Sequence, residues 1–329
     1  DLLKQCLDDG ISVCSANYRF STHQPFPGPM QDGARVVQFL RANAKQLDID
    51  PKRIALSGSS AGAGMSLWIA FKDDMATMEA AVFTLATKRD LSVWHWSSSD
   101  GKKSIEVAPS AYGRATMHDK DLLIYIESHL VAAFNRGETP SRTVSFSGYH
   151  YLKATGKNTW SDDYRRLKQT MDRLRGTTIK TNIKTGGREI TTSFGLIDAW
   201  TVIEAGKEDE RKVAICVTIS EWLYNAIKAS EILTLNPAYF GLRKPLERRM
   251  YEIARKHAGR QGLWEIGFET LRNKWGSPVE RARQFRSEVK KSPAADNLPD
   301  YRVTVTAAGK VRFISRDPAQ VAKRLAKAK

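Results

Sequence analysis

Apolar residues recur at helical spacing between residues 161 and 175 and form one stripe, made of Tyr164, Leu167, Met171 and Leu174. The opposite face of this predicted helix carries cationic and amide side chains: Arg165, Arg166, Gln169 and Arg173. Ser161 is the predicted N-cap, and the two aspartates after it favour the positive end of the helix dipole. The pattern predicts an amphipathic helix with a basic, solvent-facing side.

A predicted β-hairpin follows this helix directly. Residues 177–190 contain two β-rich runs joined at Gly186 and Gly187. A helix with a basic outer face followed by a hairpin is typical of the reading end of a winged helix. An ordinary solvated helix would show the same polar face, so this helix taken alone supports both interpretations.

The elements predicted ahead of this helix complete the same arrangement. A long amphipathic helix is predicted over residues 119–136, a short strand over 143–146 and a short helix over 148–154. The order helix, strand, helix, helix, hairpin is that of a winged helix, a variant of the helix-turn-helix. We expect residues 76–230 to form a first winged-helix domain, which also contains a strand at 194–203.

The same order of elements returns in residues 231–316. Helices are predicted at 245–257 and 268–275, with a strand at 264–266 between them. The next helix begins with Ser277 as N-cap and places Ala282, Phe285 and Val289 on its apolar stripe. A second hairpin, the predicted wing, is formed by residues 301–306 and 310–315. The sequence therefore predicts an α+β fold with tandem winged-helix domains, followed by a basic tail at 317–329.

The two predicted reading helices match position by position at a constant offset of 118 in the numbering. Arg165 aligns with Arg283, Arg166 with Gln284, Gln169 with Ser287, and Arg173 with Lys291. Two unrelated solvated helices have no reason to match in both the apolar stripe and the polar face. The repeat therefore favours nucleic-acid binding over the solvated-helix interpretation.

Residues 1–75 predict a different kind of structure. A buried strand at 10–18, a helix at 31–46 and a second strand at 53–56 precede the string G-S-S-A-G at 58–62. Strand, G-x-S-x-G and helix form the context of a nucleophile elbow, with Ser60 as the nucleophile. This stretch resembles the middle of an α/β-hydrolase of the carboxylesterase kind.

The hydrolase resemblance stops near Asp74. No H-G-G-type oxyanion loop precedes the first strand, and no later acid and histidine continue the βαβ order. A serine without a triad and an oxyanion hole loses many orders of magnitude in rate. We therefore expect an incomplete α/β-hydrolase fragment without catalytic residues, and a protein that is not an enzyme.

Charge separates the same two regions. The chain carries a formal net charge of +16. Residues 1–75 hold four Lys and four Arg against eight Asp, so the whole positive excess follows them. A strongly basic region predicts a polyanionic partner, nucleic acid before membrane. No apolar run is long enough for a membrane span, no signal peptide opens the chain, and three isolated cysteines suggest neither zinc nor disulfides. We expect a cytoplasmic protein.

Several strings after residue 75 resemble the plasmid replication initiator protein A family. They include H-D-K-D-L-L-I-Y at 118–125, R-L-R-G-T-T-I-K-T-N-I-K-T-G-G-R-E at 173–189, F-G-L-I-D-A-W at 194–200 and L-R-K-P-L-E-R-R-M-Y-E-I-A-R-K-H at 242–257. The similarity runs from about residue 75 to 315. It implies binding to repeated sites in double-stranded plasmid origin DNA, with opening of adjacent duplex. It also implies partners among host replication proteins, a replicative helicase and an initiator ATPase, and homodimers that repress their own gene.

Each candidate DNA-binding residue has an expected partner. Five candidates are expected to neutralise backbone phosphates, an interaction that does not depend on DNA sequence: Arg173, Lys290, Lys291, Arg302 and Arg312. Other candidates are expected to contact base edges in the major groove. Arginine suits guanine, which applies to Arg165, Arg166 and Arg283, and glutamine suits adenine, which applies to Gln169 and Gln284. The alternative for each is an exposed side chain or an ion pair within the protein. No ligand spacing or P-loop is present, so we expect no metal and no cofactor.

The sequence also allows two other functions. A carboxylesterase-type hydrolase would act through Ser60. A winged-helix transcriptional repressor would share every DNA-binding feature but would not support replication.

Overall fold

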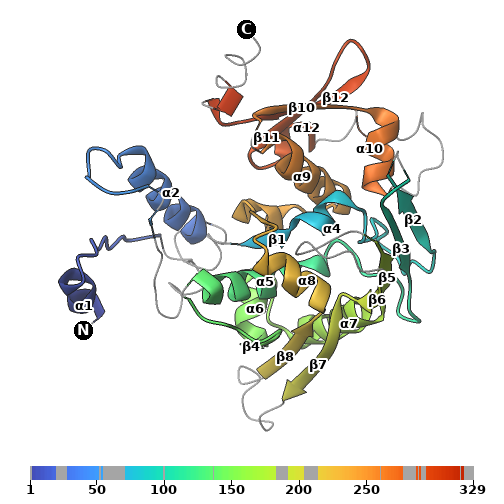
Figure 1. The fold of residues 1–329 in the computed structure, drawn as a ribbon, viewed down its shortest axis with the longest axis horizontal. Helices are drawn as coiled ribbons and strands as arrows, with labels where there is room; N and C mark the ends of the chain where they lie inside the picture. The colour runs from blue at the N-terminus through green and yellow to red at the C-terminus, as the bar shows by residue number, and fades with distance from the viewer. Residues whose placement is uncertain are drawn as a thin grey trace. The chain divides into compact units, whose positions relative to one another are not determined.

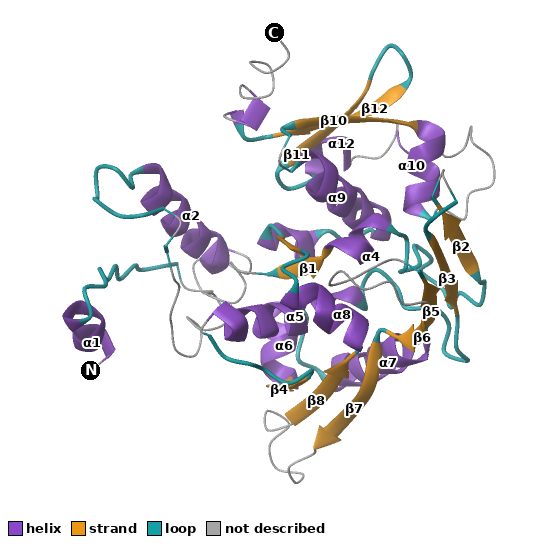
Figure 2. Cartoon of the chain, viewed as in Figure 1, coloured by secondary structure: helices purple, strands orange, loops and turns teal. Residues whose placement is uncertain are grey.

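The computed structural model describes residues 2–19, 28–51, 53–54, 71–98, 101–135, 137–182, 192–203, 214–259, 261–276, 287, 289, 294–318 and 320–321. The chain divides into two compact units, Asp1–Ile69 and Ala70–Lys329. Figures 1 and 2 show the elements of each unit. Among the described residues, no helix is both long and apolar enough to cross a membrane.

The first unit contains two helices in its described part, α1 (Leu2–Asp8) and α2 (Gly28–Ala42). The predicted strand at 10–18 is wrong, because these residues form neither helix nor strand. Ile11 and Val13 are 55% and 41% exposed, so the apolar run has no partner strand to cover it in the described residues. The second predicted strand and the G-S-S-A-G string lie largely or wholly outside the described residues.

The second unit begins with a short strand that pairs far along the chain. Strand β1 (Lys72–Asp74) pairs antiparallel with β9 (Ile232–Thr234). Helix α4 (Met75–Glu79) follows at once, and Asp74 caps it by accepting from two backbone N–H groups of its first turn. The 3-10 helix η2 (Pro237–Gly241) comes after β9.

Four antiparallel strands form one sheet in the order β2-β3-β5-β6. Their bounds are β2 (Trp94–Ser97), β3 (Ser104–Ala108), β5 (Thr178–Thr181) and β6 (Thr192–Gly195). β5 and β6 pair in antiparallel register, while the turn predicted at Gly186 and Gly187 lies outside the described residues. The predicted strand at 194–203 is two strands, because the chain leaves this sheet after Gly195.

A second sheet has three strands in the order β4-β8-β7. Its strands are β4 (Thr143–Ser147), β7 (Ile197–Ile203) and β8 (Ala214–Ile219). The helices of this part of the chain are α5 (Lys120–Asn135), α6 (Gly148–Ala154), α7 (Ser161–Gly176) and α8 (Glu221–Lys228). α5 packs at the centre, since twelve of its sixteen residues are buried.

A third sheet repeats that strand order as β10-β12-β11. Its strands are β10 (Leu263–Gly267), β11 (Tyr301–Val305) and β12 (Lys310–Ser315). The described helices around it are α9 (Pro245–Ala258), α10 (Phe268–Trp275) and α12 (Ala294–Asn297). In both three-stranded sheets the strand that follows the long helix pairs with the last strand of the set. The order of elements predicted as a repeat therefore recurs in the sheet pairing as well.

Buried ion pairs connect the segments on either side of residue 231. The ammonium nitrogen of Lys120, at the start of α5, lies 2.8 Å from Asp73 Oδ2 and 3.1 Å from Glu252 Oε1. All three side chains are 1% exposed or less. Arg248 of α9 pairs with Asp121 of α5, and both are also buried. The second unit thus shares one core between α5 and α9.

Arg249 adds neutral partners to this charged core. Its guanidinium donates to the backbone carbonyls of Thr77 and Met78 at 3.1 and 3.0 Å. A further bond of 2.5 Å runs to the carbonyl of Lys274 at the end of α10. One buried arginine therefore binds the end of α4 and the end of α10 together.

Gly276 ends α10 in the left-handed conformation, with φ of 61°. A Cβ added there would lie 2.4 Å from the Cβ of Ala81. We predict that Gly276→Ala lowers the free energy of unfolding by about 2–4 kcal/mol, from the left-handed φ and the clash together. Urea denaturation measures this decrease.

Gly309 provides the matched control for this prediction. Its φ is 71°, but a Cβ at that position meets no atom within 4 Å. Gly309→Ala should therefore cost only the backbone strain, about 1 kcal/mol. Equal decreases in the two variants would show that the clash with Ala81 contributes nothing.

Candidate nucleic-acid interface

Helix α7 buries the stripe that the sequence predicts. Leu167, Met171 and Leu174 are at most 3% exposed, and Tyr164 is half-buried. The predicted N-cap is off by one position, because Ser161 is the first helical residue and Trp160 holds the N-cap place. The helix therefore presents one fixed face to the core and leaves the other free for a ligand.

Three of the predicted reading residues project from that outer face. The side chains of Arg165 and Arg166 are 69% and 71% exposed, and Gln169 is exposed as well. Arg165 lies 3.0 Å from Asp162 and Arg166 lies 3.6 Å from Asp163, one helical turn back. The Arg165–Asp162 pair is exposed on both sides and contributes little stability, so Arg165 can exchange its aspartate for a ligand at small cost. Asp163 is only 14% exposed, but the guanidinium of Arg166 reaches it from an exposed position.

Arg173 lies in a different environment from the other three. Its Nε and Nη2 donate to the two carboxylate oxygens of Asp119, each at 2.7 Å. The side chain is only 23% exposed, and the hydrogen bonds to Asp119 raise the pKa of its guanidinium. This two-pronged pair holds the last turns of α7 against the start of α5, which is a structural role.

Most of the second predicted reading helix lies outside the described residues. That applies to four of its candidate residues: Arg283, Gln284, Lys290 and Lys291. Ser287 is described and half-buried, while Val289 of the predicted stripe is 3% exposed.

The two candidates on the third sheet are both paired with acids. Arg302 of β11 is exposed and lies 3.3 Å from Asp296. Arg312 of β12 lies directly across the sheet from Glu265, with 2.6 Å between their charged atoms. Both pairs are at the surface, so neither arginine is fixed by burial.

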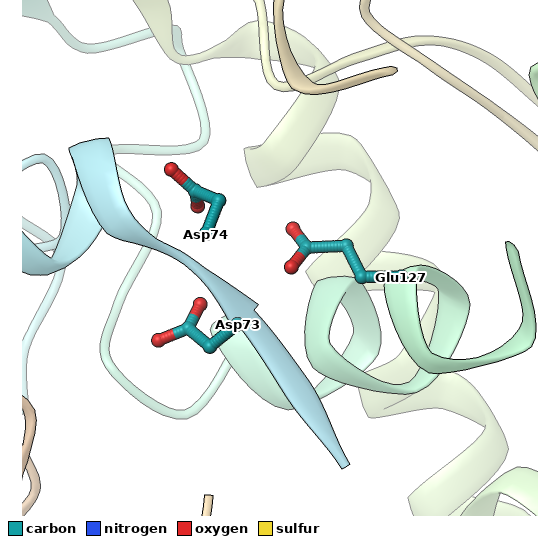
Figure 3. A group of neighbouring side chains, drawn as sticks. All are labelled: Asp73, Asp74 and Glu127. Atoms are coloured by element: carbon teal, nitrogen blue, oxygen red, sulfur yellow. The ribbon is translucent and has the colours of Figure 1, made fainter. Parts of the chain in front are cut away.

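Three carboxylates gather at the junction of β1 and α5, as Figure 3 shows: Asp73, Asp74 and Glu127. Carboxylate oxygens are ligands for hard cations, so this is the group in the described residues that could hold one. However, Asp74 caps α4 and Asp73 pairs with Lys120. Burial, together with the charges of Asp74 and Asp73, raises the pKa of Glu127 well above its usual value. The arrangement is that of a packed polar core, in which burial raises the pKa of both Asp73 and Glu127.

The Glu127 carboxyl yields a stability prediction. The pKa of such an acid is higher in the folded state than in the unfolded state, so the unfolded state gives up the proton more easily. The group therefore lowers the free energy of unfolding at every pH above its unfolded pKa. We predict that Glu127→Gln, which mimics the neutral acid, raises the free energy of unfolding at pH 7 by about 1 kcal/mol or more. The gain should vanish below about pH 4.

Urea denaturation at a series of pH values measures the Glu127→Gln effect. Glu269→Gln is the matched control, because that side chain is 57% exposed in a surface pair with Arg272. It should leave the stability unchanged at each pH. A decrease in the stability of Glu127→Gln at pH 7 would mean that Glu127 is charged in the folded protein.

One exposed residue of this surface is absent from the sequence predictions. Trp160, directly ahead of α7, is 74% exposed, although an aromatic residue next to an apolar stripe reads as core. No sequence signal distinguishes it from a buried tryptophan. Ser60 and the glycines around it, by contrast, lie outside the described residues.

Comparison with known proteins matches two families, and the hydrolase-type match runs past the predicted end near Asp74, so the two matches overlap over residues 72–95. The family model of replication initiator protein A matches residues 72–303, and the BD-FAE model matches residues 1–95. A Wigglesworthia glossinidia brevipalpis protein that carries a replication-protein name is 34% identical over 236 residues, which is 71% of this chain and 84% of the relative.

Two further comparisons concern the hydrolase-like start and the fold. An AB hydrolase superfamily protein of Schizosaccharomyces pombe is 35% identical over 60 residues, which is 18% of either chain. The crystal structure of domains 2 and 3 of RctB superposes with a TM-score of 0.50 at 14% identity, over 75% of this chain and 96% of that one. This likeness concerns the mixed helix-and-strand fold alone.

Both resemblances predicted from the sequence are therefore confirmed. The hydrolase similarity is confined to the start of the chain, and the initiator similarity covers most of the remainder. The match over residues 72–303 and the 34% identity to the replication-named relative show that the chain belongs to the replication initiator protein A family.

Proposed function

We propose that this chain is a plasmid replication initiator that binds repeated sites in double-stranded origin DNA. The observation that carries the proposal is the outer face of α7, where Arg165, Arg166 and Gln169 project from a helix whose other face is buried. Arginine suits guanine and glutamine suits adenine in the major groove. The positive charge that follows residue 75 supplies the electrostatic attraction to phosphates.

The reading helices belong, in this proposal, to two winged-helix domains at 76–230 and 231–316. We assign the first wing to the hairpin β7–β8 rather than to residues 177–190. The reason is that β8 pairs with β4 in the way that β12 pairs with β10, whereas β5 pairs with β3 as well as β6. The wing of the second domain is β11–β12, as the sequence predicts.

Arg302 and Arg312 are proposed phosphate contacts on the second wing, and Arg283, Gln284, Ser287, Lys290 and Lys291 remain proposed contacts of the second reading helix. Arg173 is left out, since its guanidinium is bound to Asp119. Recruitment of a host helicase and initiator ATPase, opening of adjacent duplex and self-repression by dimers complete the proposal by family resemblance.

The hydrolase-like start has no catalytic role in this proposal. A serine needs a histidine, an acid and an oxyanion hole to attack an ester. Ser60→Ala should therefore leave replication unchanged, and neither form should hydrolyse a short-chain ester. Ester hydrolysis that Ser60→Ala abolishes would instead favour the carboxylesterase function.

The test of the proposal is replication of an origin supplied in trans. A plasmid that holds only the origin of the encoding replicon should be maintained when the chain is expressed from a second plasmid. Footprinting on that origin should show protection at repeated sites. Protection without maintenance would identify a repressor, and neither protection nor maintenance would overturn the proposal.

A further inference from the structure

Trp160 is the most exposed of the large apolar residues that the structure describes, at 74%. It lies at the N-cap position of α7, immediately before the proposed reading helix. Its backbone carbonyl accepts from the N–H groups of Asp163 and Tyr164, at 2.9 and 3.3 Å. Within the described residues, the indole makes no hydrogen bond or ring contact of its own.

Helix formation does not account for a tryptophan here. N-cap positions favour Ser, Thr, Asp and Asn, whose side chains accept from the first turn, and these residues stabilise a helix by about 1 kcal/mol relative to apolar ones. The Trp160 side chain makes no such bond. Trp160 therefore does not cap the helix and exposes a large apolar side chain to water. Residues that break such local rules are expected at functional sites.

The surroundings of Trp160 favour nucleic acid over protein as its partner. The helix that follows exposes Arg165, Arg166 and Gln169, whereas protein interfaces surround a central tryptophan with other apolar groups. The other strongly exposed large apolar residues of the second unit are Leu91, Val93, Tyr112 and Ile203, none of which is on α7 or in residues 155–160. In the described part of the chain, Trp160 is thus an isolated apolar group at the start of a helix whose first turn holds Asp162 and Asp163, paired with Arg165 and Arg166 of the outer face.

We propose that Trp160 contacts a thymine methyl group in the major groove of the bound origin site and so contributes to sequence specificity. This inference rests on the proposed function. The amino-terminal residues of a reading helix lie closest to the bases. Thymine alone among the bases presents an apolar group in the major groove. Trp160 precedes Arg165 by about 8 Å along the helix axis, a little over two base-pair steps of about 3.4 Å, so the two side chains would reach different base pairs of one site.

The test compares a footprinted origin duplex with a copy in which uracil replaces every thymine of the site. This exchange removes methyl groups and leaves all hydrogen-bonding groups in place. Wild-type affinity should fall about four-fold for each methyl group that Trp160 covers. Trp160→Ala should bind the thymine duplex roughly ten-fold more weakly and should lose its response to uracil. The salt dependence of binding should not change, because no charge is removed.

Tyr112→Ala is the matched control, since Tyr112 is 59% exposed and lines a surface pocket at the other end of α7 with Asp172 and Arg175. It should bind both duplexes as the wild type does. An equal uracil effect in wild type and Trp160→Ala would overturn the inference. A changed sedimentation coefficient of Trp160→Ala with unchanged DNA affinity would also overturn it, in favour of a protein contact.

Failure of this inference is separable from failure of the proposed function. If Arg165→Ala and Arg166→Ala weaken origin binding while Trp160→Ala does not, only the thymine contact is wrong. If the wild-type chain binds the origin duplex no better than a scrambled one, the proposed function itself is wrong.

Discussion

The double substitution Arg165→Ala and Arg166→Ala should reduce affinity for the origin duplex about 100-fold or more. Each arginine in good contact with a base contributes about 1–3 kcal/mol of discrimination. The two side chains are more than two-thirds exposed, so the substitutions leave the core of α7 untouched. The slope of log K against log salt should change by less than about one unit, because both arginines are proposed to contact bases rather than phosphates. Fluorescence anisotropy on a labelled duplex measures both quantities.

The control for this double variant is an exposed cation elsewhere in the unit. Lys228 lies at the end of α8 on the surface, and Lys228→Ala should leave origin affinity within about two-fold of wild type. Thermal unfolding should be unchanged in all variants, because surface ion pairs such as Arg165–Asp162 contribute about 1 kcal/mol at most. Wild-type affinity in the double variant would remove α7 from the DNA interface.

Of the single substitutions that we predict, Lys120→Met should lower the free energy of unfolding most. It leaves Asp73 and Glu252 buried without their shared ammonium group. Burial alone would lower the pKa of Lys120, but the Asp73 and Glu252 carboxylates outweigh burial and raise it, so the amine is charged in the folded protein. Removal of one member of a buried pair costs about 3–5 kcal/mol. Urea denaturation should show a decrease of this size.

The second variant in this experiment is Lys120→Met with Asp73→Asn. Neutralising the stranded carboxylate should restore part of the stability, since the cost lies in the uncompensated charge rather than in the shape. Lys103→Met, on the exposed turn between β2 and β3, should have no effect. If Lys120→Met lowers the free energy of unfolding by less than about 1 kcal/mol, the amine does not hold the buried cluster together.

Local pattern was sufficient for most elements of the second unit. The predicted helix at 161–175 corresponds to α7, and those at 245–257 and 268–275 correspond to α9 and α10 with at most one residue of difference. Helical periodicity reports one buried face, which α7 and α10 have, whereas residues 247–254 of α9 are buried on all sides. The strand predicted at 10–18 failed for the opposite reason. A run of apolar residues becomes a strand only if a partner covers it, and Ile11 and Val13 remain exposed.

The site residues were harder to predict because their partners are distant in sequence. A helical wheel places Arg166 and Arg173 on the same outer face, yet Arg173 binds Asp119, 54 residues earlier. Lys120 and Arg248 look like surface charges in the sequence, but both are buried. Their partners, Asp73 and Glu252 for Lys120 and Asp121 for Arg248, lie at least 47 residues away in the sequence. The same applies to β5, whose pairing with β3 joins Ile179 to Val107 and leaves β7–β8 as the proposed wing.

The most direct test of the central claim is the salt dependence of binding to origin DNA. Affinity for the footprinted duplex and for a scrambled duplex of equal length should be measured from about 50 to 200 mM salt. We predict a slope of log K against log salt of about −3 or steeper for both duplexes, with the origin duplex bound at least about 1000-fold more tightly. A slope near zero, or equal affinity for the two duplexes, would contradict sequence-specific DNA binding by this chain.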